Sequence, residues 1–278
     1  MKSFEPVQGS FGKCKNTNCL LPVSQGRCKT VLFEIPGVTA LTVCLDYCHT
    51  KYLGSDQYQF GSVLALLVHH VMPNTPQNNL GTCWRFIKKF YKDNDTEYRY
   101  QYLNKLTMFM RKKGYPKLRG KAAEIKCLGP ALLALWTGFM NPALSVHKQV
   151  KLMLKCNVQM EQILSDHKDR IALPAGPAKQ FKDVAFVMAQ AQNAVAQHFL
   201  GDENLFNVTS KTHAVLHSAL LAKFISPRRV WCFRGESYMR HAQKMAKSCV
   251  RRLKGPAVVV KMAAHMRLAM DMRFRKQF

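Results

Sequence analysis

The chain has 278 residues, of which 47% are hydrophobic, and its 42 Lys and Arg residues against 16 Asp and Glu residues give a formal net charge of +26. This amount of apolar material is enough for a packed core and excludes a disordered basic tail. The charge favours a polyanion over an acidic small molecule, because basic side chains release counterions when they neutralise phosphates.

The sequence offers no segment for secretion or for a membrane span. The first fifteen residues lack the apolar core of a signal peptide, and Pro130 and Pro142 interrupt the longest uncharged run, residues 127–146. We therefore expect no membrane partner, an intracellular and nuclear location, and reduced cysteines.

In chain order, β structure is predicted first and helices follow. Short β-branched runs at residues 30–35 and 40–46 are separated by Pro36 and Gly37, and they form the predicted β element. Residues 173–177 are expected to be a linker. Helical spacing predicts helices at residues 60–71, 83–92, 98–112, 122–140, 143–167, 179–200, 211–224, 236–253 and 258–274. The expected fold class is mainly α with a small N-terminal β element, divided into segments 1–54, 55–210 and 211–278.

Basic residues are concentrated in two segments. Residues 211–278 hold 16 basic and 2 acidic side chains, a local net charge of 16 − 2 = +14, and residues 85–126 hold 13 and 4, or +9. These segments could line one groove for nucleic acid, or they could be ordinary solvated helix faces.

Zinc is not expected. Cys14, Cys19 and Cys28 are irregularly spaced, and although Cys44, Cys48 or His49 could complete a site, the pattern lacks the second tight pair of a structural zinc site. Free thiols are the alternative.

Asp46 ends the second predicted strand, and His49 follows three residues later at the entry to a loop. Carboxylates at strand ends hold the metal ions of phosphoryl-transfer enzymes, because a strand fixes the position of the oxygen. The alternative is that Asp46 caps a helix or forms a turn.

A second group of polar residues lies in the C-terminal segment. His213 and His217 are four residues apart, so they share a helix face that could bind a metal or a phosphate, or could simply pack against neighbours. Glu236 follows the strand-like run at residues 230–233. It could bind a metal, or it could complement the helix N-terminus and nearby arginines.

Two of these segments resemble blocks of eukaryotic cut-and-paste transposases of the CACTA and Kyakuja-Dileera-Zisupton type. The run CLDYCHTKYLG at residues 44–54 is similar to the Asp-x-x-His block around their second catalytic aspartate. Residues 211–236, with Lys-x-His-x-x-x-His, a Pro-Arg turn and Trp-Cys-Phe before an acid, are similar to the block that carries their last acid. Only the order and spacing of predicted elements support the likeness between these two ends.

The resemblance implies an RNase H-like sheet, present here in part, with a large helical insertion between the second and third acids. Asp46 and Glu236 would be catalytic ligands of Mg²⁺ or Mn²⁺, and they would meet in space. The residues implied to contact nucleic acid, with DNA favoured, are His49, His213, His217, Arg228, Arg229, Arg234, Arg251 and Arg252.

The first acid of the family has no counterpart, because Glu34 is the only carboxylate between Glu5 and Asp46. The resemblance therefore implies a C-terminal portion of a transposase that lacks the first catalytic strand and is catalytically incomplete. A non-enzymatic, basic helical module that binds nucleic acid is the alternative. A positive face that binds an acidic protein is a further one.

Overall fold

The computed structural model describes residues 35–36, 44–201, 203–250 and 255–275, without the side chains of residues 234–238, 240, 273 and 274. The chain divides into two units, residues 1–44 and Leu45–Phe278, and the second is described below. It is mainly helical, which confirms the predicted class. The predicted strands at 30–35 and 40–46 lie almost wholly outside the described residues. Residues 44–46 are not a strand, and no strand occurs in the described ranges.

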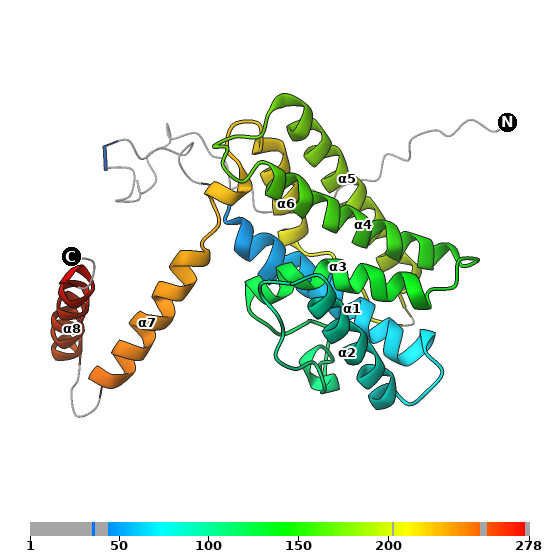
Figure 1. Ribbon diagram of the computed structural model, residues 1–278, viewed down its shortest axis with the longest axis horizontal. Helices are drawn as coiled ribbons and strands as arrows, with labels where there is room; N and C mark the ends of the chain where they lie inside the picture. Colours follow the sequence, from blue (N-terminus) through cyan, green and yellow to red (C-terminus); the bar gives the residue numbers. More distant parts are fainter. Residues whose placement is uncertain (1–34, 37–43, 202, 251–254, 276–278) are drawn as a thin grey trace. The chain divides into compact units, whose positions relative to one another are not determined.

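Eight α-helices are present in the described part of the chain (Figure 1). They are α1 (Asp56–Leu66), α2 (Pro76–Asp93), α3 (Ala122–Phe139), α4 (Ser145–Asp166), α5 (Ala175–His198), α6 (Ser210–Leu221), α7 (Phe233–Cys249) and α8 (Pro256–Arg275). The π-helical segments η4 (Cys48–Ser55) and η5 (Leu67–Val71) extend α1 at its two ends. Short 3₁₀ turns, η6 (Leu106–Met108) and η7 (Pro227–Arg229), lie in the connections. The predicted linker at 173–177 is shorter than expected, because α5 already begins at Ala175.

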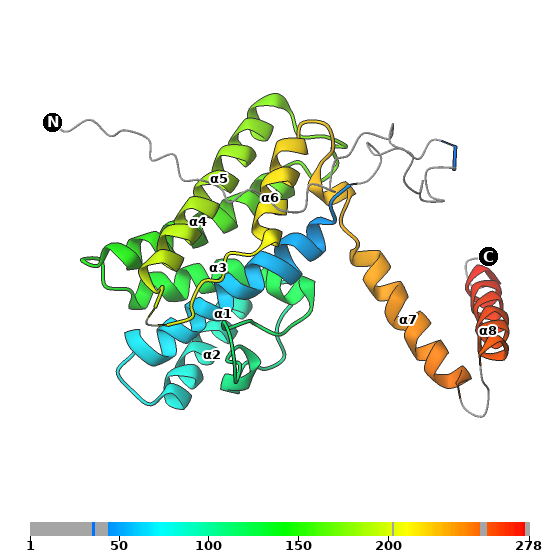
Figure 2. The same cartoon turned by 180° about the vertical axis from the view of Figure 1, so that it is seen from behind.

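Helix α1 forms the centre of the helical body, as the two opposite views show (Figures 1 and 2). Every residue of this helix except Tyr58 is buried. Its apolar residues, among them Phe60, Leu64 and Leu66, join one core with side chains of α2 to α6. Each fully buried side chain of this size contributes about 1.5–3 kcal/mol to folding. A helix buried on all faces must also bury its polar residues, and these form the network described below.

The helices around α1 are amphipathic. In α2, buried Leu80, Cys83, Ile87 and Tyr91 recur every three or four residues, which is the spacing of one helix face. Its start is stabilised by Thr75, whose hydroxyl accepts the backbone N–H of Asn78 (3.4 Å), and by a proline in the first turn. Helices α4 and α5 form the most extensive pair, and α3 packs against α4.

Residues 98–112 are not the predicted helix, apart from the single turn η6. Tyr100, Leu103 and Phe109 are buried. The carbonyl of Phe109 accepts the backbone N–H of Lys117 (2.7 Å), and the carbonyl of Met108 accepts that of Arg119 (2.8 Å). Tertiary bonds therefore take the place of helical ones in this segment.

Helix α6 crosses η4 at Gly54. A side-chain carbon at this position would lie 2.7 Å from the carbonyl oxygen of His49 and 2.7 Å from the Lys211 side chain. The Lys211 ammonium donates to the carbonyl of Leu53 (3.2 Å). Glycine is thus required for close packing of the helix that carries His49 against α6.

Candidate functional site

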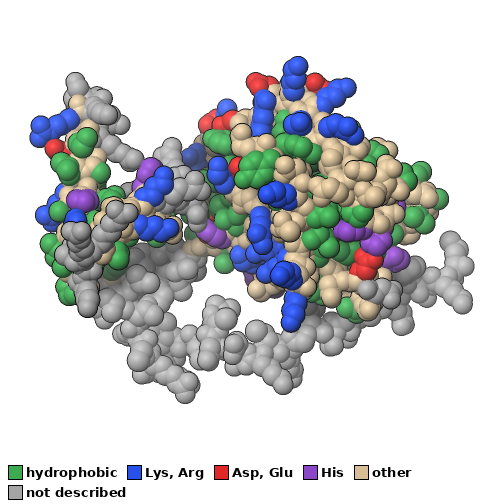
Figure 3. Space-filling view, turned by 90° about the horizontal axis from the view of Figure 1, so that it is seen from below, with side chains coloured by type: hydrophobic (Ala, Val, Ile, Leu, Met, Phe, Trp, Pro, Cys, Tyr) green, Lys and Arg blue, Asp and Glu red, His purple; other side chains and the backbone are tan. Residues whose placement is uncertain are grey.

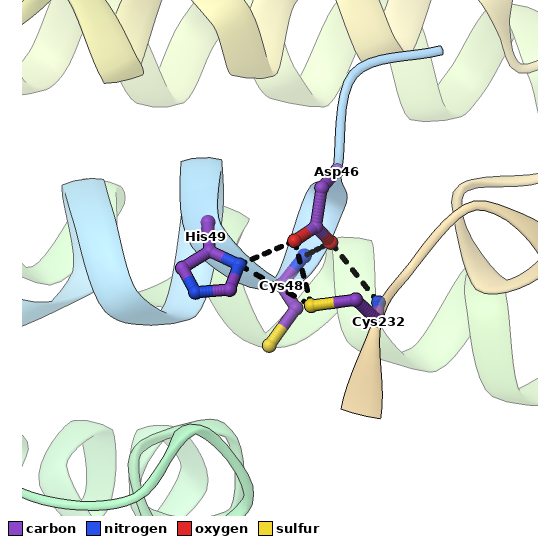
Figure 4. Close-up of side chains that lie close together, drawn as sticks. All are labelled: Asp46, Cys48, His49 and Cys232. Atoms are coloured by element: carbon purple, nitrogen blue, oxygen red, sulfur yellow. Dashed lines mark hydrogen bonds and ion pairs between the residues drawn. The ribbon is translucent and has the colours of Figure 1, made fainter. Parts of the chain in front are cut away.

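Two segments that are far apart in sequence meet at Asp46. Its Oδ1 accepts the backbone N–H of Cys232 (3.1 Å), and its Oδ2 lies 2.8 Å from Cys232 Sγ. The His49 ring contacts the same oxygen through Nδ1, and this nitrogen lies 3.2 Å from Cys232 Sγ (Figure 4). With Cys48 Sγ, one potential ligand atom from each of the four residues lies within 4.8 Å of the other three.

The start of η4 holds Asp46 in place. Its Oδ1 also accepts the backbone N–H of Cys48 (2.9 Å), and its carbonyl accepts the N–H of Thr50 (3.0 Å). Partial burial by itself would raise the pKa of Asp46. The hydrogen bonds from Cys232, His49 and the backbone outweigh burial and hold the pKa below its usual value. Asp46 thus orders the start of a helix through Oδ1, while its Oδ2 faces His49 and Cys232.

A buried charged network lies on the same helical segment. The ammonium of Lys51 is fully buried, 2.8 Å from Asp56 Oδ2 and 3.1 Å from Glu161 Oε1. Asn157 of α4 accepts a hydrogen bond from Lys51 (3.0 Å) and donates one to Asp56 (2.7 Å). The contact with Glu161 is an ion pair. This network fixes η4, and with it Cys48 and His49, to α4.

Aromatic side chains hold the segment before α7, which is residues 230–232, and the first residue of α7 against η4. The Tyr52 ring centroid lies 6.5 Å from that of Trp231 and 5.5 Å from that of Phe233, the two neighbours of Cys232. The Tyr52 hydroxyl donates to Glu161 (2.8 Å). Arg228 lies over the Trp231 ring at 4.7 Å. Cys232 is therefore positioned by packing on both sides and not by the contact with Asp46 alone.

The geometry of the four residues limits their chemistry. A Cys-His-Asp catalytic triad uses opposite ring nitrogens of the histidine for the nucleophile and the acid. Here the same atom, Nδ1 of His49, faces both Cys232 and Asp46, so the arrangement is not that of a triad. Sulfur and imidazole donors suit zinc, whereas Mg²⁺ is bound by oxygen. These residues could hold a zinc-like ion.

The strand-like run at residues 230–233 is not a strand in the structure. Val230 is in a bend, the next two residues have no regular structure, and Phe233 begins α7. The Pro-Arg turn before it is the 3₁₀ turn η7, and tertiary packing of Trp231 and Phe233 overrides their β preference. The backbone of Glu236 is in the first turn of α7, four residues after Cys232, and its side chain lies outside the described residues.

The other predicted nucleic-acid residues are dispersed. His213 and His217 are exposed on α6, with their Nε2 atoms 2.7 Å apart. Arg229 donates to the carbonyls of Asp169 (2.8 Å) and Arg170 (3.2 Å), so it supplies hydrogen bonds to backbone carbonyls in the loop after α4. The Arg234 side chain, Arg251 and Arg252 lie outside the described residues, as do Cys14, Cys19 and Cys28.

Helix α2 presents a row of exposed basic side chains within the basic segment at residues 85–126. We call this row the basic stripe, and it consists of the four exposed residues Arg85, Lys88, Lys89 and Lys92. Their spacing of three, one and three residues places them on one helix face, opposite the buried face. None of the four forms an ion pair with an acid in the described part of the chain.

The connection after α2 adds further exposed bases. They are Lys105, Arg111, Lys112, Lys113, Arg119 and Lys121. Lys121 alone among them is ion-paired with a described acid, Glu124 (3.5 Å). On the side of the molecule where α2 lies in Figure 1, Lys and Arg side chains gather across the helical body with few acids among them (Figure 3).

A hollow of about 450 Å³ lies elsewhere, beside His69 and His70. His70 Nε2 is 3.0 Å from Glu203 Oε1 there, and both side chains are partly exposed. None of the predicted site residues lines this hollow, and it takes no part in the site.

Comparison with protein-family models, with curated proteins and with solved structures finds no match. None of the helices among the described residues is both long and apolar enough to cross a membrane.

Sequence reasoning missed Lys51 and the role of Cys232. Lys51 follows the polar residues His49 and Thr50, so its sequence neighbours do not signal burial, and its partners Asn157 and Glu161 are more than a hundred residues away. Cys232 belongs to the Trp-Cys-Phe run, and nothing in the spacing connects it with Asp46.

Proposed function

We propose that this chain is a nucleic-acid-binding protein, with DNA as its favoured partner, derived from a DDE transposase and catalytically incomplete. One observation carries the proposal: the block around Asp46 touches Cys232, four residues before Glu236. These are the two blocks that resemble the transposases, and the segment between them is helical. A partial RNase H-like sheet, which would have to lie before residue 44, and a nuclear location belong to the same proposal.

In such an ancestor Asp46 and Glu236 would hold Mg²⁺ or Mn²⁺ together with a third acid, and the ions would activate water or a hydroxyl for in-line displacement. The first acid has no candidate in this sequence. Cys232 and His49 surround Asp46 with sulfur and nitrogen. We therefore expect the chain to bind DNA without cleaving or joining it.

The basic stripe is the best-defined binding surface. Its four cations are exposed and have no described acid as a partner, so a phosphate backbone would neutralise them with release of counterions. Trp84 is half-buried beside them, with Lys88 5.7 Å from its ring centre, and it is therefore largely committed to packing. The surface suits backbone contacts and offers little for base readout.

The test is a fluorescence anisotropy titration of a DNA duplex at several salt concentrations. Affinity should fall about tenfold to a thousandfold between about 50 and 200 mM salt. Changing all four residues of the basic stripe to Gln should weaken binding to every sequence alike and lower the salt slope by about 3 to 4.

A control variant removes the same charge elsewhere. It carries Gln at four other exposed lysines, Lys148, Lys155, Lys168 and Lys179. We expect this control to keep most of the affinity and of the salt slope. A response to salt that is flat, or equal losses in both variants, would contradict the assignment of the surface. Tight binding to an acidic protein without any to DNA would favour that alternative partner.

A cleavage assay in Mg²⁺ or Mn²⁺ tests the catalytic part. Intact DNA is the expected product, and cleavage that disappears in Asp46→Asn would show a working site.

The donor set around Asp46 favours one alternative, a basic helical module that binds nucleic acid and never used these acids. Glu236→Gln separates the two: a Mn²⁺ site detected by electron paramagnetic resonance and lost in both Asp46→Asn and Glu236→Gln would support the transposase origin.

A further inference from the structure

We propose that Asp46, His49 and Cys232, with Cys48 as the fourth ligand, bind one zinc ion that fastens the segment before α7 to the start of η4. The inference concerns these residues alone and does not depend on nucleic-acid binding. It differs from the expectation that zinc is absent, because that expectation rests on the spacing of Cys14, Cys19 and Cys28, and none of these three is involved.

The donor atoms already converge. Asp46 Oδ2, His49 Nδ1 and Cys232 Sγ are mutual neighbours, with the sulfur 2.8 Å from the oxygen and 3.2 Å from the nitrogen (Figure 4). Zinc binds such donors at about 2.0–2.3 Å, so a tetrahedral site separates them by about 3.3–3.6 Å. Opening the group by a few tenths of an ångström to about an ångström would admit the ion.

The carboxylate is oriented as a metal ligand is. Its Oδ1 accepts two backbone N–H groups, from Cys48 (2.9 Å) and Cys232 (3.1 Å), which leaves Oδ2 directed at the other donors. Hydrogen bonds to the remote atom of a ligand commonly fix its orientation and tune the affinity of the metal. The two bonds come from the two segments that the ion would join.

The fourth position falls to Cys48. Its sulfur lies within 4.8 Å of the other ligand atoms, and the residue is buried on the first turn of η4. Two thiolates, one imidazole and one carboxylate form a set that prefers zinc over Mg²⁺ or Ca²⁺. A closed set of four protein ligands is typical of structural zinc, and not of a catalytic ion with an open position.

A zinc ion here would join residues that are 183 positions or more apart in sequence. In the unfolded chain these ligands would be far apart and would not hold the ion. The free energy of zinc binding would therefore add to the stability of the fold. The aromatic packing of Trp231 and Phe233 on Tyr52 prepares the site, and the ion would lock that packing.

The experiment loads the purified, reduced full-length chain with zinc and measures the bound metal by mass spectrometry after gel filtration. We expect one equivalent. Cys232→Ser and His49→Gln should each lower zinc affinity at least about 100-fold. The control is Cys44→Ser, a nearby exposed cysteine outside the group, which should keep wild-type affinity. Circular dichroism of each variant establishes that it is folded. Wild-type protein that binds no zinc, or a folded Cys232→Ser that binds it equally well, would overturn the proposal.

Cobalt substitution tests the ligands directly. Tetrahedral Co²⁺ bound to two thiolates gives a thiolate-to-metal charge-transfer band, which should lose about half of its intensity in Cys48→Ser. An unchanged band would overturn the assignment of Cys48. A disulfide between Cys48 and Cys232 in the protein as purified from cells under thiol-blocking conditions would overturn the site altogether.

Hydrogen exchange tests the fastening role. Removing zinc with a chelator should speed exchange at the backbone N–H groups of Cys48 and Cys232, while the buried face of α3 stays protected. Equal protection at those two positions before and after complete metal removal would contradict a fastening role.

Discussion

Cys83 shows how burial decides the chemistry of a single thiol. Its side chain is fully buried in α2, with Sγ 3.6 Å from the Met72 sulfur, and desolvation raises its pKa to about 12. Because the thiolate is the reactive form, Cys83 is inert, whereas Cys44 is exposed. The sequence alone does not separate the two thiols.

We predict a measurable effect of Cys83 on alkaline stability. An unfolded thiol loses its proton near pH 8.5, whereas the folded one keeps its proton up to about 12. The folded state binds more protons in this window, so the free energy of unfolding should fall by about 1.4 kcal/mol per pH unit as pH rises. Urea unfolding between pH 7 and 10 should show a decline that is about 2 kcal/mol smaller in Cys83→Ala than in the wild type.

The control for this measurement is Cys44→Ala, which should show the wild-type decline because Cys44 is exposed. Alkylation followed by mass spectrometry gives a second readout, with Cys44 modified in the native protein and Cys83 only after unfolding. An equal pH dependence in wild type and Cys83→Ala would show that the Cys83 thiol titrates normally in the fold.

At the scale of elements, periodicity predicted helices well wherever one face meets the core. The helix predicted at 122–140 is α3, the one at 143–167 is α4, and the one at 179–200 is most of α5. Two failures have a physical cause. Residues 98–112 have apolar spacing, but their backbone bonds to other segments, and the beginning of the central helix at residue 48 is hidden by polar residues and Gly54.

Asn79 is an element-scale feature that spacing does not reveal. It is fully buried in α2, and its amide group donates to the carbonyls of Val68 (2.9 Å), Met72 (3.1 Å) and Asn74 (2.7 Å). These carbonyls lie at or just beyond the end of η5, where helical partners run out. One side chain thus closes the turn that joins the central helix to α2.

We predict that Asn79→Ala lowers the free energy of unfolding by about 2–4 kcal/mol, because it leaves the carbonyls of the two buried residues Val68 and Met72 with fewer hydrogen bonds. Chemical denaturation measures the loss. The control is Asn78→Ala, an exposed position on the same helix, which should change stability by less than about 1 kcal/mol. A loss of the same small size at both positions would mean that water replaces the amide of Asn79.

At the scale of the whole molecule, sequence reasoning found half of the candidate site. Asp46 and His49 were identified from a local pattern, and the structure places Asp46 in contact with Cys232, four residues before Glu236. Their distance from the Glu236 carboxylate stays a prediction. The sulfur donor was missed because metal-ligand spacing is informative only within a short segment, and here the fold supplies the partner.

The buried network around Lys51 is the other long-range feature, and it joins η4 to α1 and α4. Burial alone would lower the pKa of Lys51, but the charges of Asp56 and Glu161 outweigh it and raise the pKa. The lysine therefore stays charged at neutral pH. A charge this deep is tolerated only because its partners surround it.

We predict that Lys51→Met destabilises the whole fold by about 3–5 kcal/mol, because it leaves Asp56 and Glu161 buried with no positive charge between them. Adding Asp56→Asn should recover part of the loss, because it removes one of the stranded charges, and chemical denaturation of both single variants and the double variant measures the coupling. The matched control is Lys121→Met, which breaks a pair with Glu124 where the lysine is 63% exposed and should cost less than about 1 kcal/mol. A loss for Lys51→Met no larger than for this control would mean that the network adds little to stability and that apolar packing alone holds η4 in place.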